Sequence, residues 1–252
     1  MTVNPRSEQV SVRQVSAQRW YEAQSWELAF WRDGQRKRGW KRLVWPLLAP
    51  GLRAIDWKRA WGDDWNHWWK RRFDNYRFLP TNLGDYVELG CGPFTNTRLI
   101  LKDRQASRVV CSDPLARSYV SFSGRWLAEA YAAERIEIDD HPIEETPFPP
   151  ESFDAVVMVN VLDHVRDANL CMRNAIGLLR TGGYFLLGQD LSNEQDLARH
   201  PYDVGHPIRL RLEDLEPYLA GLQPVLRKDL SRGEGRDPRL HYATLVYAGR
   251  KR

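Results

Sequence analysis

A glycine turn beside an acidic residue is the clearest candidate for chemistry in this sequence. In the stretch VELGCGPFTNT, residues 87–97, Glu88 precedes a turn that contains Gly90 and Gly92. Glycine has no Cβ, so a ligand can approach its backbone closely. A helix that begins near Thr95 would add the partial positive charge of its amino terminus. The stretch therefore predicts a binding loop for a small ligand.

The loop departs from two common nucleotide-binding patterns. The dinucleotide fingerprint G-x-G-x-x-G would require glycine at position 95, where the chain has Thr95, and no Gly-Lys-Ser/Thr follows as in a Walker loop. A nucleotide-dependent oxidoreductase stays an alternative that Thr95 disfavours. Cys91, Cys111 and Cys171 are too few and too widely spaced for a disulfide framework or a zinc site, and we expect no metal.

Alternating strands and helices must position this loop. Apolar runs predict strands at 85–90, 107–113, 135–139, 152–160, 184–190, 224–230 and 241–249. The segments between them predict helices at 95–103, 115–131, 167–180 and 212–222. This alternation indicates an α/β fold with a parallel sheet that helices cover on both faces. Ligands bind such sheets at the carboxyl ends of the strands, where the glycine loop is expected.

Four segments in order carry a resemblance to a known family. They are VELGCGP, VVCSDP, PFPPESFDAVVMVNVLDHV and LLRTGGYFLL, within residues 85–190. Their order and spacing resemble the class I S-adenosylmethionine-dependent methyltransferases, of the small-molecule and glycan type. The resemblance implies a Rossmann-like, mainly parallel seven-stranded sheet and S-adenosylmethionine as the cofactor. A third glycine commonly ends the loop in that family, whereas Phe94 stands there, so its ring must point away from the ligand or cover it.

The resemblance also assigns cofactor contacts to residues at the ends of the predicted strands. It implies that Glu88 faces the methionine ammonium, directly or through water, and that Asp113 accepts both ribose hydroxyls. The adenine contact falls either to Asp140 or to the stretch 142–144. Asn160 is expected where the methyl donor and acceptor meet. The full expected set is Glu88, Gly90, Cys91, Gly92, Asp113, Pro114, Asp140, Ile143 and Asn160.

Two histidines are the candidates for acid–base catalysis. Transfer from a sulfonium needs a base only where the acceptor is a hydroxyl, whose pKa is far above 7. Similar enzymes place the segments that carry His164 and His206 around the acceptor pocket. A packing or capping role is the competing interpretation for His164, and Asp163 either caps the next helix or orients His164. The preferred acceptor is a hydroxyl of a small molecule or a saccharide, with nitrogen methylation left open.

Residues 1–80 differ from the rest in charge and aromatic content. They hold 16 Lys and Arg against 8 Asp and Glu, and ten of the eleven tryptophans. We therefore expect a basic, Trp-rich, mainly helical extension at 1–80 and a methyltransferase domain at 81–252. Helical spacing of Trp57, Trp61, Trp65 and Trp68, with Trp69 beside them, favours a cap packed on the acceptor side of the domain.

Other functions of the basic extension are open at this stage. Residues 36–53 could contact a membrane surface through basic and aromatic side chains. Nucleic acid binding ranks last, because residues 81–252 are net acidic. A non-catalytic cofactor-binding subunit that recruits a membrane or a partner is a further alternative. No apolar run approaches the roughly 20 residues of a membrane span, so we expect a cytoplasmic protein, with any membrane contact peripheral and at the inner face.

Overall fold

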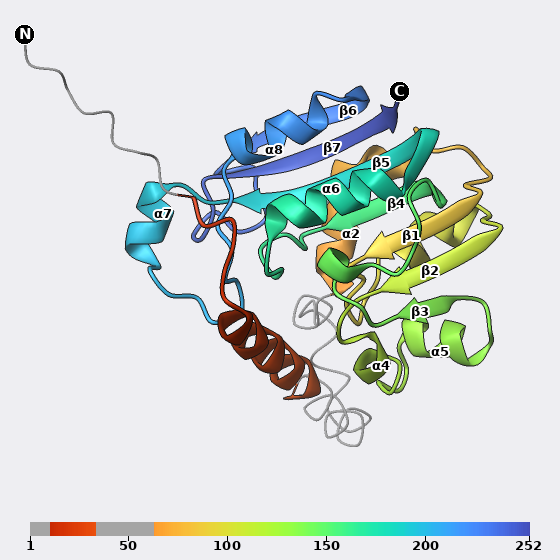
Figure 1. The fold of residues 1–252 in the computed structure, drawn as a ribbon, viewed down its shortest axis with the longest axis horizontal. Helices are drawn as coiled ribbons and strands as arrows, with labels where there is room; N and C mark the ends of the chain where they lie inside the picture. The colour runs from red at the N-terminus through yellow and green to blue at the C-terminus, as the bar shows by residue number, and fades with distance from the viewer. Residues whose placement is uncertain (1–10, 34–62) are drawn as a thin grey trace, which may run out of the picture.

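A seven-stranded sheet is the centre of the computed structural model, which describes residues 11–33 and 63–252 (Figure 1). Its strand order is β3-β2-β1-β4-β5-β7-β6. The first five strands in this order are parallel, and β7 runs antiparallel to both β5 and β6. The strands are β1 Asp85–Leu89, β2 Arg108–Ser112, β3 Glu137–Asp139, β4 Phe153–Val159, β5 Leu179–Leu191, β6 Leu222–Ser231 and β7 Ala243–Lys251. The expected mainly parallel, seven-stranded Rossmann-like sheet is confirmed.

Helices cover both faces of the sheet because consecutive strand residues alternate between them. On β1, Val87 and Leu89 join one core with α6 and α8, and Tyr86 joins a second core with α2 and α3. Figure 1 shows α6 and α8 in front of the sheet and α2 behind it. The labelled helices are α2 Asp63–Arg72, α3 Thr97–Ile100, α4 Ala116–Tyr119, α5 Trp126–Ala132, α6 Ala168–Leu178, α7 Glu194–Arg199 and α8 Leu212–Leu219. Short 3₁₀ turns occur at Asp74–Tyr76, Leu101–Asp103 and Ile143–Glu145.

Several predicted elements differ from the observed ones. The single helix expected over 115–131 is wrong, because the chain turns between α4 and α5, where Gly124 has φ +67°. Helix α7 was not predicted at all. Strand β5 begins at Leu179 rather than at 184, and the helix predicted over 167–180 ends at Leu178. These differences leave the order of the core elements unchanged.

A further helix, over residues 17–33, lies before the first labelled one and is drawn in dark red in Figure 1. Isolated bridges pair Val12 with Arg209 and Gln14 with Asp167, which attaches the segment before the helix to the domain. The helix lies at the end of the sheet where the parallel strands terminate (Figure 1). Trp20 and Ala23 on its inner face are buried. This part of the 1–80 extension is therefore packed on the domain, as a cap would be.

The tryptophan cluster near α2 is only partly within the described residues. Trp69 is buried in the core behind the sheet, and its ring lies against Gly188 of β5, where an added Cβ would come within 2.8 Å. Trp68 packs at the edge of this core. Trp57, Trp61 and the segment 36–53, with the expected membrane contact, lie outside the described residues. The domain boundary near 80 stays a prediction.

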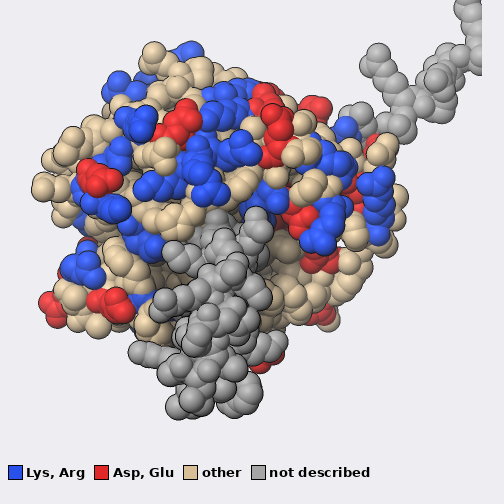
Figure 2. Space-filling model, turned by 180° about the vertical axis from the view of Figure 1, so that it is seen from behind, with Lys and Arg blue, Asp and Glu red and all other residues tan. Residues whose placement is uncertain are grey.

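Lys and Arg side chains gather on the face behind the sheet, with Asp and Glu between them (Figure 2). On β6, Arg227 is ion-paired with Glu216 and Asp229, and Lys228 is paired with Asp74. Each of these cations is therefore compensated by a neighbouring acid. Among the described residues, no helix has the length and apolar character that crossing a membrane would require.

Candidate active site

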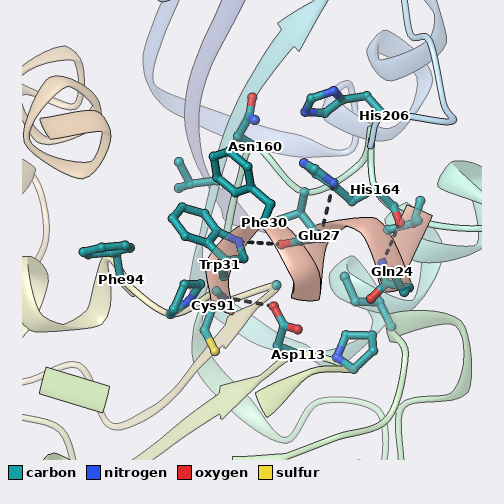
Figure 3. Close-up of a pocket in the computed structure, with 18 of the residues that line it drawn as sticks. Gln24, Glu27, Phe30, Trp31, Cys91, Phe94, Asp113, Asn160, His164 and His206 are labelled. Atoms are coloured by element: carbon teal, nitrogen blue, oxygen red, sulfur yellow. Dashed lines mark hydrogen bonds and ion pairs between the residues drawn. The ribbon is translucent and has the colours of Figure 1, made fainter. Parts of the chain in front are cut away.

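A cavity of about 320 Å³ opens where β1, β2 and β4 end. The strand order reverses at β1, whose neighbours in the sheet are β2 and β4, and ligands bind at such switch points. The glycine loop forms one part of the wall, and the helix over 17–33 crosses the opposite side (Figure 3). Of the expected site residues, the cavity wall contains Gly90, Cys91, Gly92, Asp113, Pro114, Ile143, Asn160, His164 and His206.

The glycine loop has the backbone conformation that the sequence predicts. Gly90 has φ +68°, and an added Cβ would lie 2.4 Å from a methyl group of Val161, so only glycine fits there. The amides of Gly90 and Cys91 both donate to the carbonyl of Ser112, and that of Gly92 donates to Asp113. These three amides are therefore hydrogen-bonded within the protein, and the close approach of a ligand to the loop stays a prediction. They hold the loop to the end of β2, and the loop surface lines the cavity.

Glu88 does not line the cavity, which corrects the expectation that it faces the cofactor. Its side chain is buried, at 1% exposure, beneath the loop. One carboxylate oxygen accepts from the amide nitrogen of Asn96 at 2.9 Å, and the other accepts from the amide of Thr97 at 2.8 Å. The hydroxyls of Thr95 and Thr97 and the Asn96 side chain also donate to it. Glu88 thus caps the first turn of α3, together with the Thr95 hydroxyl, which accepts from the Thr97 amide at 3.0 Å.

Asp113 follows β2 and points into the cavity (Figure 3). Its Oδ2 accepts from the amide of Gly92 at 3.0 Å, and its Oδ1 accepts from the amide of Leu115 at 2.8 Å. Burial raises the pKa of Asp113 to about 7, and the negative charge of Glu27 adds to the rise. Each carboxylate oxygen keeps a lone pair beyond these bonds, so the group can accept from a ligand hydroxyl pair.

Only one of the two expected adenine contacts lines the cavity. Asp140 does not line the cavity and forms an ion pair with Arg117, with an Nε–Oδ2 distance of 2.5 Å, so its inclusion in the site is wrong. Ile143 and Glu144 line the cavity from the 3₁₀ turn after β3. The Glu144 carboxylate already forms hydrogen bonds within the protein, because its Oε1 accepts from the amides of Arg166 and Asp167 at 2.7 and 2.9 Å.

The acceptor end of the cavity contains both predicted histidines. Their rings are 4.6 Å apart in an edge-to-face arrangement, with Asn160 nearby in Figure 3. His164 Nδ1 is 3.5 Å from Glu27 Oε2, and His206 Nδ1 is 2.9 Å from Asp203 Oδ2. Burial alone lowers the pKa of His206, but the hydrogen bond to Asp203 and the charges of Asp203 and Asp163 outweigh it, so the net shift is upward.

Residues of the helix over 17–33 line the cavity although the sequence analysis did not select them. Trp20 Nε1 and Gln24 Nε2 donate to the carbonyl of His164 at 3.1 and 3.3 Å. Glu27 accepts from the hydroxyl of Tyr119 at 3.0 Å and from Trp31 Nε1 at 3.3 Å. The available signal was their spacing: Trp20, Gln24, Glu27 and Trp31 share one helix face, on which two polar side chains lie between two tryptophans.

Phe94 covers the cavity rather than pointing away. Its ring centre is 5.4 Å from that of Trp31, and the guanidinium of Arg125 lies 3.9 Å above it. The Asn66 side chain of α2 donates to the Phe94 carbonyl. Where the family usually has glycine, this chain therefore has an aromatic contact between the loop, α5 and the amino-terminal helix.

A second missed set comes from the segment before β7. Arg236 and His241 line the same cavity. Asp190 holds the Arg236 guanidinium at 2.8 Å, and Ser192 contacts His241 Nδ1 at 3.2 Å. Burial lowers the pKa of His241. No spacing in the sequence distinguishes these residues, because they reach the site only through the segment that leads into the antiparallel strand β7.

Comparisons with known proteins agree with this arrangement. Residues 87–187 match the model of a family described as a methyltransferase domain. The 27-O-demethylrifamycin SV methyltransferase of Amycolatopsis mediterranei is 27% identical over 172 residues, which are 61% of this chain and 60% of that protein. The match therefore spans less than two thirds of that relative's length.

Solved structures show the same fold at low sequence identity. The Burkholderia thailandensis 1,6-didemethyltoxoflavin-N1-methyltransferase has a TM-score of 0.52 and 14% identity, covering 99% of this chain and 98% of that one. The [4+2]-cyclase SpnF has a TM-score of 0.55 and 17% identity, covering 86% and 96%. The four sequence segments all lie within residues 87–187, and this part of the chain is similar to methyltransferase domains.

Proposed function

We propose that the protein transfers a methyl group from S-adenosylmethionine to a hydroxyl of a small molecule. One observation carries the proposal: a single cavity joins Asp113, at the end of β2, to His164 and His206 at the other side of Asn160. The first is the group expected to bind the cofactor ribose, and the histidines are the groups expected near the acceptor. A shared cavity is what a direct transfer between two bound molecules needs.

The residues around Asp113 suit the cofactor. Its carboxylate offers two acceptor oxygens at spacing suitable for a vicinal diol, and both are already oriented by backbone amides. Ile143 supplies an apolar surface for the adenine ring from the turn after β3. Gly90 and Asn160 flank the passage toward the histidines, where the methionine end would lie.

Positioning accounts for most of the proposed mechanism. When bound, S-adenosylmethionine supplies a methyl group that is already activated for transfer. The protein then has to hold the acceptor oxygen in line with it and accept the hydroxyl proton. Because the carboxylate of Asp203 can only accept, His206 Nδ1 carries its hydrogen toward Asp203, and Nε2 is the ring atom left for the acceptor. His164 stands beside it as the second candidate.

The wall of the acceptor end favours a molecule with an apolar or ring-shaped body. Trp20, Trp26, Phe30 and Trp31 of the amino-terminal helix all line the cavity. Such faces suit the apolar rings of natural products and the CH-rich faces of saccharides alike. The curated relative from Amycolatopsis mediterranei is named for O-methylation of a rifamycin, which supports a hydroxyl acceptor on a small molecule.

A second candidate function follows from one of the structural neighbours. The cyclase SpnF has this fold and a similar TM-score, although its name describes a [4+2] cyclisation. Fold similarity at this level does not fix the reaction. A cofactor-binding protein without methyl transfer is therefore the alternative, and it predicts cofactor affinity with no methylated product.

The first test is calorimetric titration with S-adenosylhomocysteine, with NADH as the control ligand. We expect binding of the former alone. Asp113→Ala should weaken it by about 1–3 kcal/mol through lost hydrogen bonds, and Asp140→Ala, whose parent side chain lies outside the cavity, should leave it unchanged. Unchanged affinity in Asp113→Ala would remove Asp113 from the site. Incubation with a panel of hydroxylated aromatic compounds and glycosides, read by mass spectrometry, would then separate a transferase from a cofactor-binding protein.

A further inference from the structure

A buried carboxylate without partners lies beside the two histidines. Asp163 is 4% exposed, and neither of its side-chain oxygens has a hydrogen-bond partner. The capping role expected for it is therefore wrong, and its nearest basic atom is His164 Nε2 at 3.9 Å, too long for a hydrogen bond. His206, His241 and Arg236 add positive charge around it, yet no donor bonds to either of its oxygens. A buried carboxylate without hydrogen bonds is costly, and a bound cation would satisfy it.

Asp163, His164 and His206 together form a group with metal-binding chemistry. Each offers one ligand atom, and these atoms lie within 4.8 Å of one another. The bonds of a transition metal to nitrogen and oxygen are about 2.0–2.2 Å long. Side-chain rotations would therefore have to bring the three ligand atoms roughly 1 Å closer to one another. His164 and His206 line the cavity, which leaves the fourth side of the group open to a ligand.

The outer contact of the His206 imidazole matches that of a metal-bound histidine. His206 Nδ1 bonds to Asp203 at 2.9 Å, whereas His164 Nδ1 has no hydrogen bond and lies 3.5 Å from the Glu27 carboxylate. Metal-ligating histidines usually direct one ring nitrogen at a carboxylate, which orients the other nitrogen to the metal. In both rings the nitrogen left over is Nε2, and His164 Nε2 is the atom on the side of Asp163.

The other group of this kind in the described residues is already satisfied. Asp139 accepts from the hydroxyl of Ser112 at 2.8 Å and contacts His141 Nδ1 at 2.7 Å, and Asp140 is paired with Arg117. The side chain of His141 is half exposed. That group needs no cation, and it serves as an internal control.

We propose that Asp163, His164 and His206 bind a divalent transition-metal ion at the acceptor end of the cavity. Two imidazole nitrogens and one carboxylate oxygen favour Mn²⁺, Fe²⁺, Co²⁺, Ni²⁺ or Zn²⁺ over Mg²⁺ or Ca²⁺, which prefer all-oxygen sites. The inference goes beyond the proposed function and holds whether or not methyl transfer occurs. It also replaces the expectation of no metal, which considered only the cysteines.

A cation at this site would change the part played by the histidines. They would act as ligands, and a hydroxyl on the open side would lose its proton to solvent more readily because the metal stabilises the alkoxide. The acceptor would then be fixed by coordination as well as by the aromatic wall.

The test is titration of the chelator-treated full chain with Co²⁺, followed by visible absorption and by calorimetry. We expect one equivalent to bind with the intense absorption of low-coordinate Co²⁺. Asp163→Asn and His206→Gln should each weaken binding by at least about tenfold, since each removes a ligand, and His141→Gln should leave it unchanged. His206→Gln covers the case in which Asp163→Asn fails to fold, which circular dichroism would report.

Two results would overturn the proposal. If the unchanged protein binds Co²⁺ no more tightly than His206→Gln does, the two histidines and Asp163 only compensate one another's charge and hold no metal. Loss of binding in His141→Gln would move the metal to the other group. Titration with S-adenosylhomocysteine in the presence of chelator tests the proposed function separately, so failure of one proposal is distinguishable from failure of the other.

Discussion

Replacing Glu88 by glutamine should destabilise the protein before any ligand is added. The carboxylate accepts two main-chain N–H groups, those of Asn96 and Thr97, one at each oxygen. In Glu88→Gln one of these oxygens becomes an NH₂ group, so in either amide orientation it meets an N–H that can only donate. With the NH₂ group in place of Oε2, the Thr97 N–H keeps a second acceptor, Thr95 Oγ1 at 3.0 Å, so this orientation is the less costly one. One main-chain hydrogen bond is still lost, and the remaining hydrogen bonds lose the assistance of the charge.

The expected loss can be worked out from these contacts. The lost main-chain hydrogen bond costs about 0.5–1.5 kcal/mol, and the loss of charge assistance adds roughly 1 kcal/mol. We therefore expect the free energy of unfolding to fall by about 1.5–2.5 kcal/mol. With an m value of about 3 kcal/mol/M in urea, the unfolding midpoint should fall by about 0.5–0.8 M.

Urea unfolding of the ligand-free protein measures this effect. Asp140→Asn is the matched control, because it removes a carboxylate from an exposed pair with Arg117 and should change the free energy of unfolding by less than about 1 kcal/mol. An unchanged midpoint in Glu88→Gln, together with weaker binding of S-adenosylhomocysteine, would refute the reasoning. Glu88 would then act on the ligand, as the sequence alone suggested.

Two further changes test the geometry of the loop and of Asp113. Gly90→Ala should lower stability by about 2–5 kcal/mol, because a backbone with φ +68° disfavours a side chain and the added Cβ meets Val161. Gly92→Ala, with φ +55° and open space, should cost only about 1–2 kcal/mol in the same urea unfolding experiment. Equal losses in the two variants would contradict the contact with Val161. For Asp113, a folded-state pKa of about 7 against about 3.9 in the unfolded chain means that the native state binds more protons between these values. The stabilisation that Asp113 contributes is therefore present at pH 4 and is lost as the pH rises to about 7. The melting temperature of the unchanged protein should fall between pH 5 and pH 8, and this fall should be smaller in Asp113→Asn.

The sequence predicted the order of the core elements because strand and helix periodicities are local. The sequence also predicted which segments line the cavity, since the carboxyl ends of neighbouring parallel strands must meet at one edge of the sheet. It could not predict which way a side chain at a strand end turns. Glu88 and Asp113 are both acids at such positions, yet one points beneath the loop and the other into the cavity.

Contacts between distant segments account for most of what the sequence missed. Glu27 lies in the site only because the helix over 17–33 packs across the strand ends. Arg236 lies there because it precedes β7, which runs antiparallel to β5. Asp140 and Ile143 illustrate a different limit. They are three positions apart, and only the course of the turn after β3 determines that the second faces the cavity.

The attachment of the amino-terminal helix has a consequence for how the protein folds. Trp20 and Gln24 bond to the carbonyl of His164 across 144 and 140 residues of chain. Contacts of such sequence separation carry a large loop-closure entropy and form after the local ones. The cavity wall should thus be completed last, because the helix over 17–33 can form these bonds only after β4 and the segment with His164 have been synthesised and have folded.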